Sequence, residues 1–366
     1  MKAVPYVDMA AQFAAERDTL MPLVESVLAG GMWVGGDAVP AFEDAAVAYT
    51  GAKHCVGVSS GTDALILSLL ALDIGPGDEV ITPPNSFVAS TAAIAHVGAT
   101  PVFADVAADQ NFDPAAVAAA VTPRTRAIMP VHLTGRLCDM AGILAVARDH
   151  GLKVIEDAAQ AIGAHIDGRQ AGTFGDAGCF SAHPLKNLNA AGDAGFVLTD
   201  DDALADRLRR LRNNGLVDRD TVVEWGFVSR LDSLQAVILS HRLGYLDTVI
   251  AARRANADRY RAGLDPAHVF VPEDAPNSFA TYHTFVIQVD RRDALKEYLA
   301  GMGIGTAIHY PVPIHLQPAA RSLGHGPGDF PVAERQAGRI LSLPINQHLS
   351  ADDIDRVIAA VNGFFQ

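Results

Sequence analysis

The chain has 366 residues, a formal charge of −14 at pH 7 and 49% hydrophobic residues, which is typical of an ordinary globular protein. The negative charge repels phosphate backbones, so nucleic acid is not an expected partner. No apolar run approaches the roughly 20 residues that cross a bilayer, and the N-terminus lacks the apolar core of a secretion signal. We therefore expect no membrane partner and a cytoplasmic protein.

Short β-rich runs alternate with helical patterns over residues 55–215. This alternation predicts an α/β fold with a mostly parallel seven-stranded sheet, covered by helices on both faces. The expected strands are Cys55–Val58, Glu79–Thr82, Pro101–Ala104, Ala127–His132, Lys153–Glu156, Gly178–Ala182 and Gly195–Thr199. The expected helices are Thr62–Leu72, Phe87–Val97, Pro114–Val121 and Asp139–His150, followed by one or two long helices over Leu231–Leu264.

Beyond about residue 265 the pattern changes to that of a smaller α+β unit. Here the expected strands are Tyr282–Val289 and Gly305–Ile308, and the expected helices are Arg291–Met302 and Ala351–Phe365. The run Tyr310–Pro331 is rich in Pro, Gly and His and predicts a loop outside the core. We expect a large domain over residues 1–250 and a smaller C-terminal domain over residues 251–366.

No metal site is expected. The cysteines Cys55, Cys138 and Cys179 are far apart, and small buried side chains are their ordinary role. The 13 histidines form no H-E-x-x-H arrangement, and the chain has no C-x-x-C pair.

Three polar segments follow strands of the expected sheet, where parallel sheets place their ligands. The first, Val58–Leu65, runs from a strand into an apolar helix through Ser59, Ser60, Gly61 and Thr62. Its small residues leave backbone N–H groups open at a helix N-terminus, which suits a phosphate, although taken alone the pattern is more often only a helix cap.

The second segment places Asp157 directly after the strand Lys153–Glu156. Such an acid often caps the next helix. The functional alternative is a carboxylate that bonds a protonated ring nitrogen and so keeps a cofactor's electron sink charged.

The third segment, Cys179–Leu188, carries Lys186 beyond a strand, with Ser181 five residues before it. Most lysines are solvated surface groups. A lysine in a tight pocket beside a cationic cofactor, however, can have its pKa lowered and form a Schiff base.

Together these segments resemble the DegT/DnrJ/StrS family of pyridoxal-phosphate-dependent sugar aminotransferases, which share the fold-type I architecture of aspartate aminotransferase. The resemblance spans nearly the whole chain. It rests on the order of several short motifs, namely Pro5–Asp8, Ser60–Leu65, Pro83–Phe87, Glu156–Gln160, the lysine segment, Ser229–Ala236, His309–Pro311, His315–Gln317, Gly328–Pro331 and Leu341–Pro344.

The resemblance implies pyridoxal 5′-phosphate as cofactor and a role for each matching residue. Lys186 and Asp157 would be catalytic, the first as Schiff-base lysine and proton carrier, the second as partner of the ring nitrogen. Gln160 would bond the ring's phenolic oxygen and Phe87 would stack on the ring. Gly61, Thr62 and Ser181 would hold the phosphate. Weaker candidates for the substrate side are His183, Arg230, His309 and Tyr310.

The family also implies its partners, which are a keto-sugar acceptor, an amino-acid donor (glutamate is expected) and a second copy of the chain in a homodimer with shared active sites. Two departures stand out. The family usually has an Asn at the position of Val228, contributed across the dimer to the phosphate, and commonly has Gly at the position of Ala194.

Other functions remain to be weighed. The family's sugar dehydratases replace the lysine with histidine, so Lys186 argues against a dehydratase. A non-catalytic regulatory member is disfavoured by the joint presence of Asp157, Gln160, Ser181 and Lys186. A nicotinamide enzyme lacks support because no G-x-G-x-x-G follows an early strand. The sequence leaves open which keto sugar is aminated, at which carbon, and whether it is nucleotide-linked.

Overall fold

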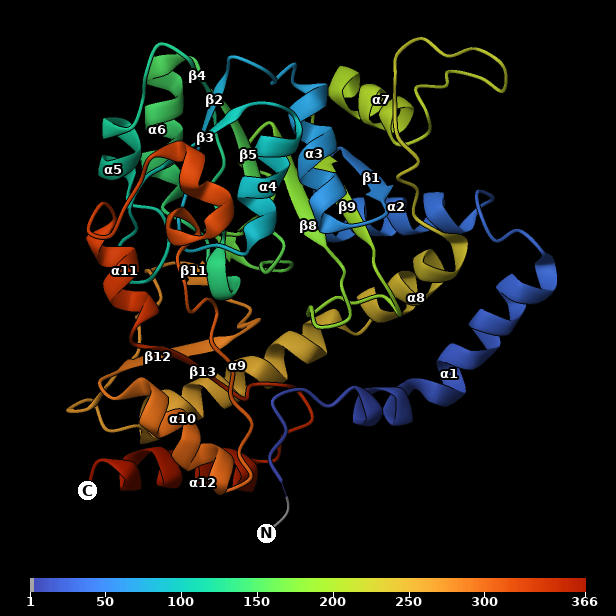
Figure 1. Ribbon diagram of the computed structural model, residues 1–366. Helices are drawn as coiled ribbons and strands as arrows, with labels where there is room; N and C mark the ends of the chain where they lie inside the picture. Colours follow the sequence, from blue (N-terminus) through green and yellow to red (C-terminus); the bar gives the residue numbers. More distant parts are fainter. Residues whose placement is uncertain (1–2) are drawn as a thin grey trace.

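A seven-stranded sheet forms the centre of the larger part of the molecule (Figure 1). The computed structural model describes residues 3–366. In spatial order the strands are β1 (His54–Val58), β9 (Gly195–Thr199), β8 (Ala177–Ser181), β5 (Lys153–Asp157), β4 (Thr125–Ile128), β2 (Glu79–Thr82) and β3 (Thr100–Phe103). All neighbouring strands are parallel except at β9, which runs antiparallel to both β1 and β8. The predicted α/β fold is confirmed.

Helices cover both faces of this sheet because successive strand residues point to opposite sides. In β2, for example, Val80 belongs to one buried cluster and Ile81 to the other. The Val80 cluster includes side chains of α3 (Gly61–Ala71), α4 (Val88–His96) and α7 (Asp202–Leu211). The Ile81 cluster includes side chains of α2 (Ala38–Thr50), α5 (Pro114–Ala119), α6 (Met140–His150) and α8 (Ser233–Leu243).

The C-terminal part has its own sheet and core. Its strands are β10 (Val269–Phe270), β12 (Phe285–Val289) and β13 (Ile340–Leu343), and its helices include α10 (Arg292–Gly301), α11 (Pro331–Ala337) and α12 (Ala351–Phe364). A capping box between Ser350 and Asp353 starts α12. A third small sheet joins β6 (His165–Ile166), β7 (Arg169–Gln170) and β11 (Ser278–Phe279).

Helix α9 (Leu246–Gly263) runs from one core to the other. Its Leu246 and Ile250 are buried with the Ile81 cluster, whereas Ala257 and Tyr260 are buried in the C-terminal cluster. Val4 also packs into the C-terminal cluster through a bridge to Ile304. The predicted boundary at residue 250 falls inside α9 and stays a prediction.

Some expected elements differ from those found. The expected strand Gly305–Ile308 is wrong, because only Ala307 forms an isolated bridge, to Ser342, while β13 was not expected. The expected loop Tyr310–Pro331 contains the 3₁₀ turns η2 (Ile314–Leu316) and η3 (Pro318–Leu323). Its Ile314 and Phe330 are buried against Phe103 of β3, so this loop is partly core and not entirely outside it.

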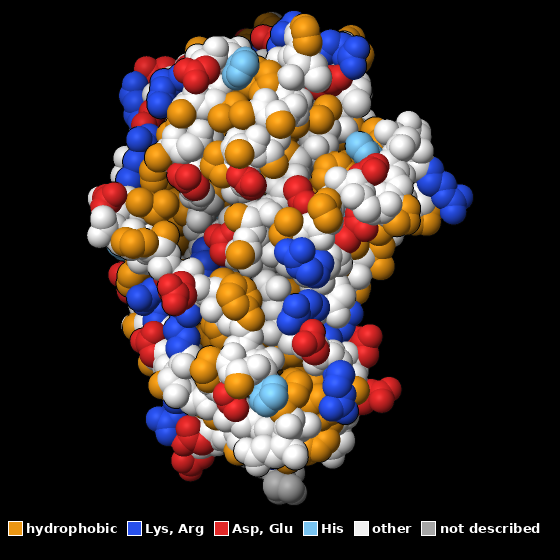
Figure 2. Space-filling model, turned by 90° about the vertical axis from the view of Figure 1, so that its left-hand side faces the viewer, with side chains coloured by type: hydrophobic (Ala, Val, Ile, Leu, Met, Phe, Trp, Pro, Cys, Tyr) orange, Lys and Arg blue, Asp and Glu red, His pale blue; other side chains and the backbone are white. Residues whose placement is uncertain are grey.

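The surface differs between sides of the molecule. On the face in Figure 2, acidic, basic and apolar side chains are interspersed. At the right-hand side of Figure 1, away from the face in Figure 2, α1 (Met9–Gly30) lies along the edge of the molecule. The segment between α7 and α8 projects from the body on the same side. Leu20 is the one residue of α1 that is buried. None of the helices in residues 3–366 is long and apolar enough to cross a membrane.

Candidate active site

The N-terminus of α3 meets the end of β8 at one edge of the sheet. The Ser60 side chain caps α3 by accepting from the Asp63 N–H at 3.1 Å. The first N–H groups of a helix have no acceptor within it, so those of Gly61 and Thr62 point outward from the cap. An added Cβ on Gly61 would lie 2.6 Å from the Ser181 Cβ, so only glycine lets the two segments approach this closely. The arrangement is a cradle of N–H and hydroxyl donors, which suits a phosphate.

Lys186 follows this cradle in the turn after β8 and lies close enough to Asp157 for their charges to interact. Burial lowers the pKa of Lys186 to about 8, although the nearby Asp157 carboxylate opposes the shift. The amine can therefore lose its proton at a pH where an ordinary lysine stays charged.

Asp157 ends β5 and is buried, with 5% of its surface exposed. Its Oδ2 accepts from the Ser90 hydroxyl at 2.7 Å, and its Oδ1 accepts from the Ala159 N–H at 3.2 Å. Burial raises the pKa of Asp157, while these two bonds and the charge of Lys186 oppose the rise. A buried carboxylate held in this way lacks a directly bonded cation among the described residues, and a protonated ring nitrogen would supply one.

Gln160 lies one turn beyond Asp157 and is also buried. Its Oε1 accepts from the Thr134 backbone N–H at 2.7 Å. The amide is therefore oriented with its Nε2 donor toward the Tyr310 hydroxyl, with which the Gln160 side chain interacts, and this donor could also bond an oxygen atom of a ligand.

Aromatic side chains from distant segments meet near Asp157, whose charge acts on Tyr310. Phe87 directly precedes α4 and has 53% of its surface exposed, and its ring lies 5.7 Å from that of Tyr310. The His309 ring packs on Tyr6, and its Nδ1 lies 2.8 Å from the Ser342 hydroxyl. Burial and the charge of Lys186 lower the pKa of His309 to about 4, so its imidazole is neutral.

The other two substrate candidates are exposed. His183 has its Nδ1 3.3 Å from the Leu185 N–H, in the turn that carries Lys186. Arg230 extends from the segment between α7 and α8 and donates to Asn213 at 3.4 Å. Val228 in the same segment is 65% exposed. Within one chain, Arg230 makes no hydrogen bond or ion pair to the Lys186 turn among residues 3–366.

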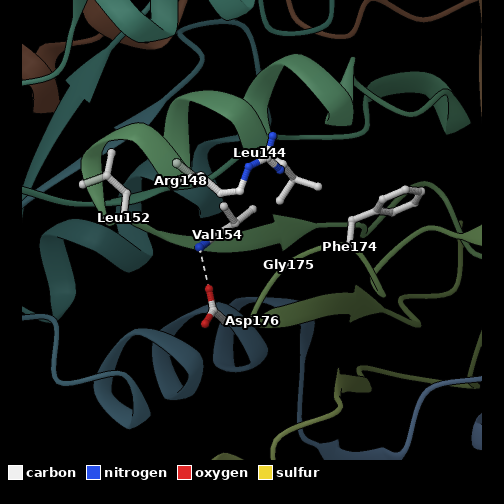
Figure 3. Close-up of a pocket in the computed structure, with 9 residues that line it drawn as sticks. Leu144, Arg148, Leu152, Val154, Phe174, Gly175 and Asp176 are labelled. Atoms are coloured by element: carbon white, nitrogen blue, oxygen red, sulfur yellow. Dashed lines mark hydrogen bonds between the residues drawn. The ribbon is translucent and has the colours of Figure 1, made fainter.

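The surface has one hollow beside Lys186 and a larger one away from the site. A cavity of about 20 Å³ opens beside Lys186, between Asp8, Arg253 and His348. A larger surface hollow of about 360 Å³ lies at the other end of β5 (Figure 3), where the Asp176 carboxylate accepts from the Val154 N–H at 2.9 Å. None of the predicted site residues lines the larger hollow.

The residues present fit pyridoxal phosphate. The α3 cradle suits its phosphate, the buried Asp157 suits a cationic ring nitrogen, the Gln160 donor suits its phenolic oxygen, and the neutral form of Lys186 suits its carbonyl carbon. These features fit a pyridoxal-phosphate site on an α/β fold.

The comparisons with known proteins agree with this class. The DegT/DnrJ/EryC1/StrS aminotransferase family matches residues 15–362, and the chain belongs to this family. It is 45% identical to the UDP-N-acetyl-3-dehydro-alpha-D-glucosamine 3-aminotransferase of Acidithiobacillus ferrooxidans, over 98% of this chain and 97% of that protein.

Solved structures show the same fold. The crystal structure of S. venezuelae DesV in complex with a ketimine intermediate has a TM-score of 0.97 and 42% identity, and the match covers 100% of this chain and 99% of that one. NtdA from Bacillus subtilis with bound cofactor PMP has a TM-score of 0.92 and 32% identity, and covers 99% of this chain and 85% of that one. The predicted family, fold type and cofactor are confirmed.

Sequence reasoning missed several neighbours of the site. Ser90 lies one helical turn after Phe87, and that spacing could have placed it on the same side of α4. Thr134 orients Gln160, and His283 lies near Lys186. The sequence around these two residues has no pattern that indicates a site. Only the fold brings them to this edge of the sheet.

Proposed function

We propose that this chain is a pyridoxal-phosphate-dependent aminotransferase that moves an amino group from glutamate to a keto sugar. The observation that carries the proposal is the juxtaposition of Lys186, whose pKa burial lowers to about 8, with the buried carboxylate of Asp157. The relative from Acidithiobacillus ferrooxidans makes a nucleotide-linked 3-keto hexose the first acceptor to test.

Each part of the site has a defined task in this proposal. Gly61, Thr62 and Ser181 hold the phosphate, Gln160 donates to the phenolic oxygen, and Phe87 stacks on the ring. When bound, pyridoxal phosphate supplies a ring that withdraws electrons from the reacting carbon of the substrate.

Lys186 is the residue that moves a proton at that reacting carbon. A general base works best when its pKa is near the operating pH, which the lowered pKa of Lys186 allows. The Asp157 carboxylate, oriented by Ser90 and the Ala159 N–H, keeps the ring nitrogen protonated. His183, His309, Tyr310 and Arg230 form the substrate side.

The proposal includes a homodimer. Large apolar side chains are exposed along α1, at residues 32–34 and along the projecting segment, namely Met9, Phe13, Met21, Leu23, Leu28, Met32, Trp33, Val34, Val217, Val222, Val223, Trp225, Phe227 and Val228. Trp225 is 91% exposed. Extended apolar surfaces of this kind favour association, and a two-fold dimer would use each surface twice. The projecting segment would then bring Arg230 to the site of the partner.

The test is a two-stage assay on the purified enzyme. Glutamate should convert the bound cofactor to its pyridoxamine form, and a panel of nucleotide-linked and free keto sugars should then convert it back, followed by absorbance. Return of the original spectrum with a keto sugar supports the proposal. Conversion back only by keto acids, with every keto sugar inert, would contradict it.

A further inference from the structure

The segment between β11 and β12 includes His283. It forms hydrogen bonds to a residue next to Lys186 and to a residue that binds Gln160. The Asn187 side chain, next to Lys186, donates to the Thr281 carbonyl at 3.0 Å. The Thr284 N–H donates at 3.4 Å to the carbonyl of Thr134, the residue that orients Gln160. The chain therefore fixes His283 between the Lys186 turn and the Gln160 turn.

The backbone that presents His283 is strained. Tyr282 is fully buried and has a φ of 45°, in the left-handed region that a bulky side chain avoids. Such a conformation is unfavourable and persists only where the surroundings hold it. Arg253 holds this one by donating to the carbonyls of Tyr282 and His283 at 3.3 and 3.1 Å. Strain retained beside a lysine of this kind indicates that the direction of the next side chain has a use.

Polar atoms around His283 are buried without partners. Among the described residues, its Nδ1, the Thr284 Oγ1 and the Asn187 Oδ1 form no hydrogen bond. Buried polar groups are nearly always bonded, so a cluster of unpaired ones indicates an absent polar ligand. The ligand would have to supply both donors and acceptors.

The charge state of His283 restricts what that ligand is. Burial, together with the charges of Lys186 and Arg253, holds the pKa of His283 well below its ordinary value. A neutral imidazole donates one hydrogen bond and accepts another. The neutral imidazole therefore matches a hydroxyl group, which also donates one hydrogen bond and accepts another. It does not match a carboxylate, because it has no positive charge to neutralise one.

We propose that His283 contacts the substrate and binds the sugar hydroxyl next to the carbon that receives the amino group. The inference rests on the proposed function, since it needs a sugar acceptor. It assigns His283 to the acceptor and leaves the amino-acid donor unaffected.

The experiment measures the two half-reactions separately, with L-glutamate and with UDP-N-acetyl-3-dehydro-glucosamine. In this sugar the carbon next to the keto group on one side carries the N-acetyl group, so the 4-hydroxyl is the adjacent hydroxyl. His283→Leu should leave the glutamate half-reaction within about 3-fold of wild type and lower kcat/KM for the keto sugar about 10- to 100-fold. His283→Gln, which can still donate and accept, should recover most of the loss.

The 4-deoxy analogue of the sugar supplies the sharpest comparison. Wild type should convert the 4-deoxy analogue about as poorly as His283→Leu converts the normal sugar. With the 4-deoxy analogue, His283→Leu should be almost no slower than wild type. The measurement of wild type with the 4-deoxy analogue does not depend on the folding of any variant. Calorimetry with the UDP-linked 3-amino sugar, a readout without turnover, should show binding weakened by a similar factor in His283→Leu and by much less in His283→Gln.

His268→Leu is the matched control, because His268 is an exposed histidine that stacks on Phe365 at 4.9 Å in the C-terminal part. It should change neither half-reaction.

If wild type reacts with glutamate but not with the sugar, the proposed acceptor fails. If wild type reacts with the sugar and His283→Leu slows both half-reactions equally, or neither, or keeps its full penalty with the 4-deoxy sugar, the inference about His283 is overturned.

Discussion

The inner wall of the candidate site is built differently from the segment between α7 and α8, which the proposed dimer would bring to the site of the partner as an outer wall. On the inner wall, Asp157, Gln160 and the capped N-terminus of α3 are all held by hydrogen bonds within the chain. On the outer side, the segment with Trp225, Val228 and Arg230 projects from the body, and Val228 and Trp225 are 65% and 91% exposed. The inner wall is held within one chain, whereas the projecting segment is anchored by bonds such as that from the Phe227 N–H to the Leu211 carbonyl and leaves its apolar side chains exposed.

This difference separates two kinds of effect. Substitutions on the inner wall should affect the chemistry, because side chains there are oriented before any ligand arrives. Substitutions on the outer segment should act first on assembly, and on the cofactor only through the partner. Five experiments test this separation.

The largest effect is expected from Lys186→Ala. Loss of both the cofactor's attachment and the proton carrier should lower turnover by about 10⁴-fold or more. The protein should still bind pyridoxal phosphate, since the α3 cradle, Asp157 and Gln160 remain. Turnover and cofactor retention after dialysis measure the two parts, and a variant that keeps more than a few per cent of wild-type turnover contradicts the assignment.

Asp157→Asn should come next, with a loss of turnover well over ~10²-fold and with the cofactor still bound. The amide does not keep the ring nitrogen charged. The loss of rate should therefore exceed what losing one charge-assisted hydrogen bond would cause at the lower end of its range of about 1.5–3 kcal/mol. Ser90→Ala, which removes one bond to Asp157, is the milder companion. Near-normal turnover of Asp157→Asn would show that Asp157 only caps the following turn.

The lowered pKa of Lys186 predicts a pH dependence in the cofactor-free protein. Its amine should be mostly protonated below pH 8 and mostly neutral above it, whereas an ordinary lysine needs a pH above about 10.4. The rate at which a small acylating reagent labels Lys186, followed by mass spectrometry, should therefore rise with a midpoint near 8. Asp157→Asn should move this midpoint lower, because the carboxylate favours the charged amine. A midpoint above 10 in wild type would contradict the geometry.

Trp225→Asp tests the outer segment. If Trp225 is a central contact between two copies, a charge there should weaken the dimer by at least about 30-fold, as loss of about 2 kcal/mol implies. Phe270→Asp is the control, since Phe270 is an exposed apolar residue of β10 outside the proposed interface. Light scattering over a dilution series measures both. Equal dissociation in both variants, or in neither, would count against this interface.

The smallest effect is expected at Val228. An Asn there can add a hydrogen bond to the phosphate in the site of the partner, so Val228→Asn should leave cofactor affinity equal or improve it by about 0.5–1.5 kcal/mol. Cofactor titration measures the change. Spared cofactor binding with impaired turnover would instead indicate that the valine shapes the pocket for an acceptor other than a usual nucleotide sugar.

Much of the inner wall could be predicted from the sequence because its signals are local. Asp157 and Ser181 each end a strand, Gly61 and Lys186 each lie shortly after one, and parallel strands bring their ends to one edge of the sheet. Ser90, Thr134 and His283 could not be predicted in the same way. They reach the site through helix phase or through contacts between residues far apart in the chain, as in the bonds from Ser90 to Asp157, 67 residues apart, and from Thr134 to Gln160, 26 residues apart.

The C-terminal part was predicted less well for a related reason. Gly305–Ile308 has a strand-like pattern, but its partners are distant single residues, Val4 near the N-terminus and Ser342 in β13, and a full ladder does not form. In the loop before α11, Ile314 and Phe330 gain their burial from Phe103 of β3. Local composition carries no information about such packing.

The most direct test of the central claim is to locate the lysine that holds the cofactor. The enzyme is incubated with pyridoxal phosphate, reduced with borohydride, digested and analysed by mass spectrometry, with Lys186→Ala treated in parallel. The account predicts the added mass on the peptide containing Lys186 in wild type, and on no peptide of the variant in comparable amount. Attachment chiefly at Lys53, Lys153 or Lys296 in wild type would contradict it.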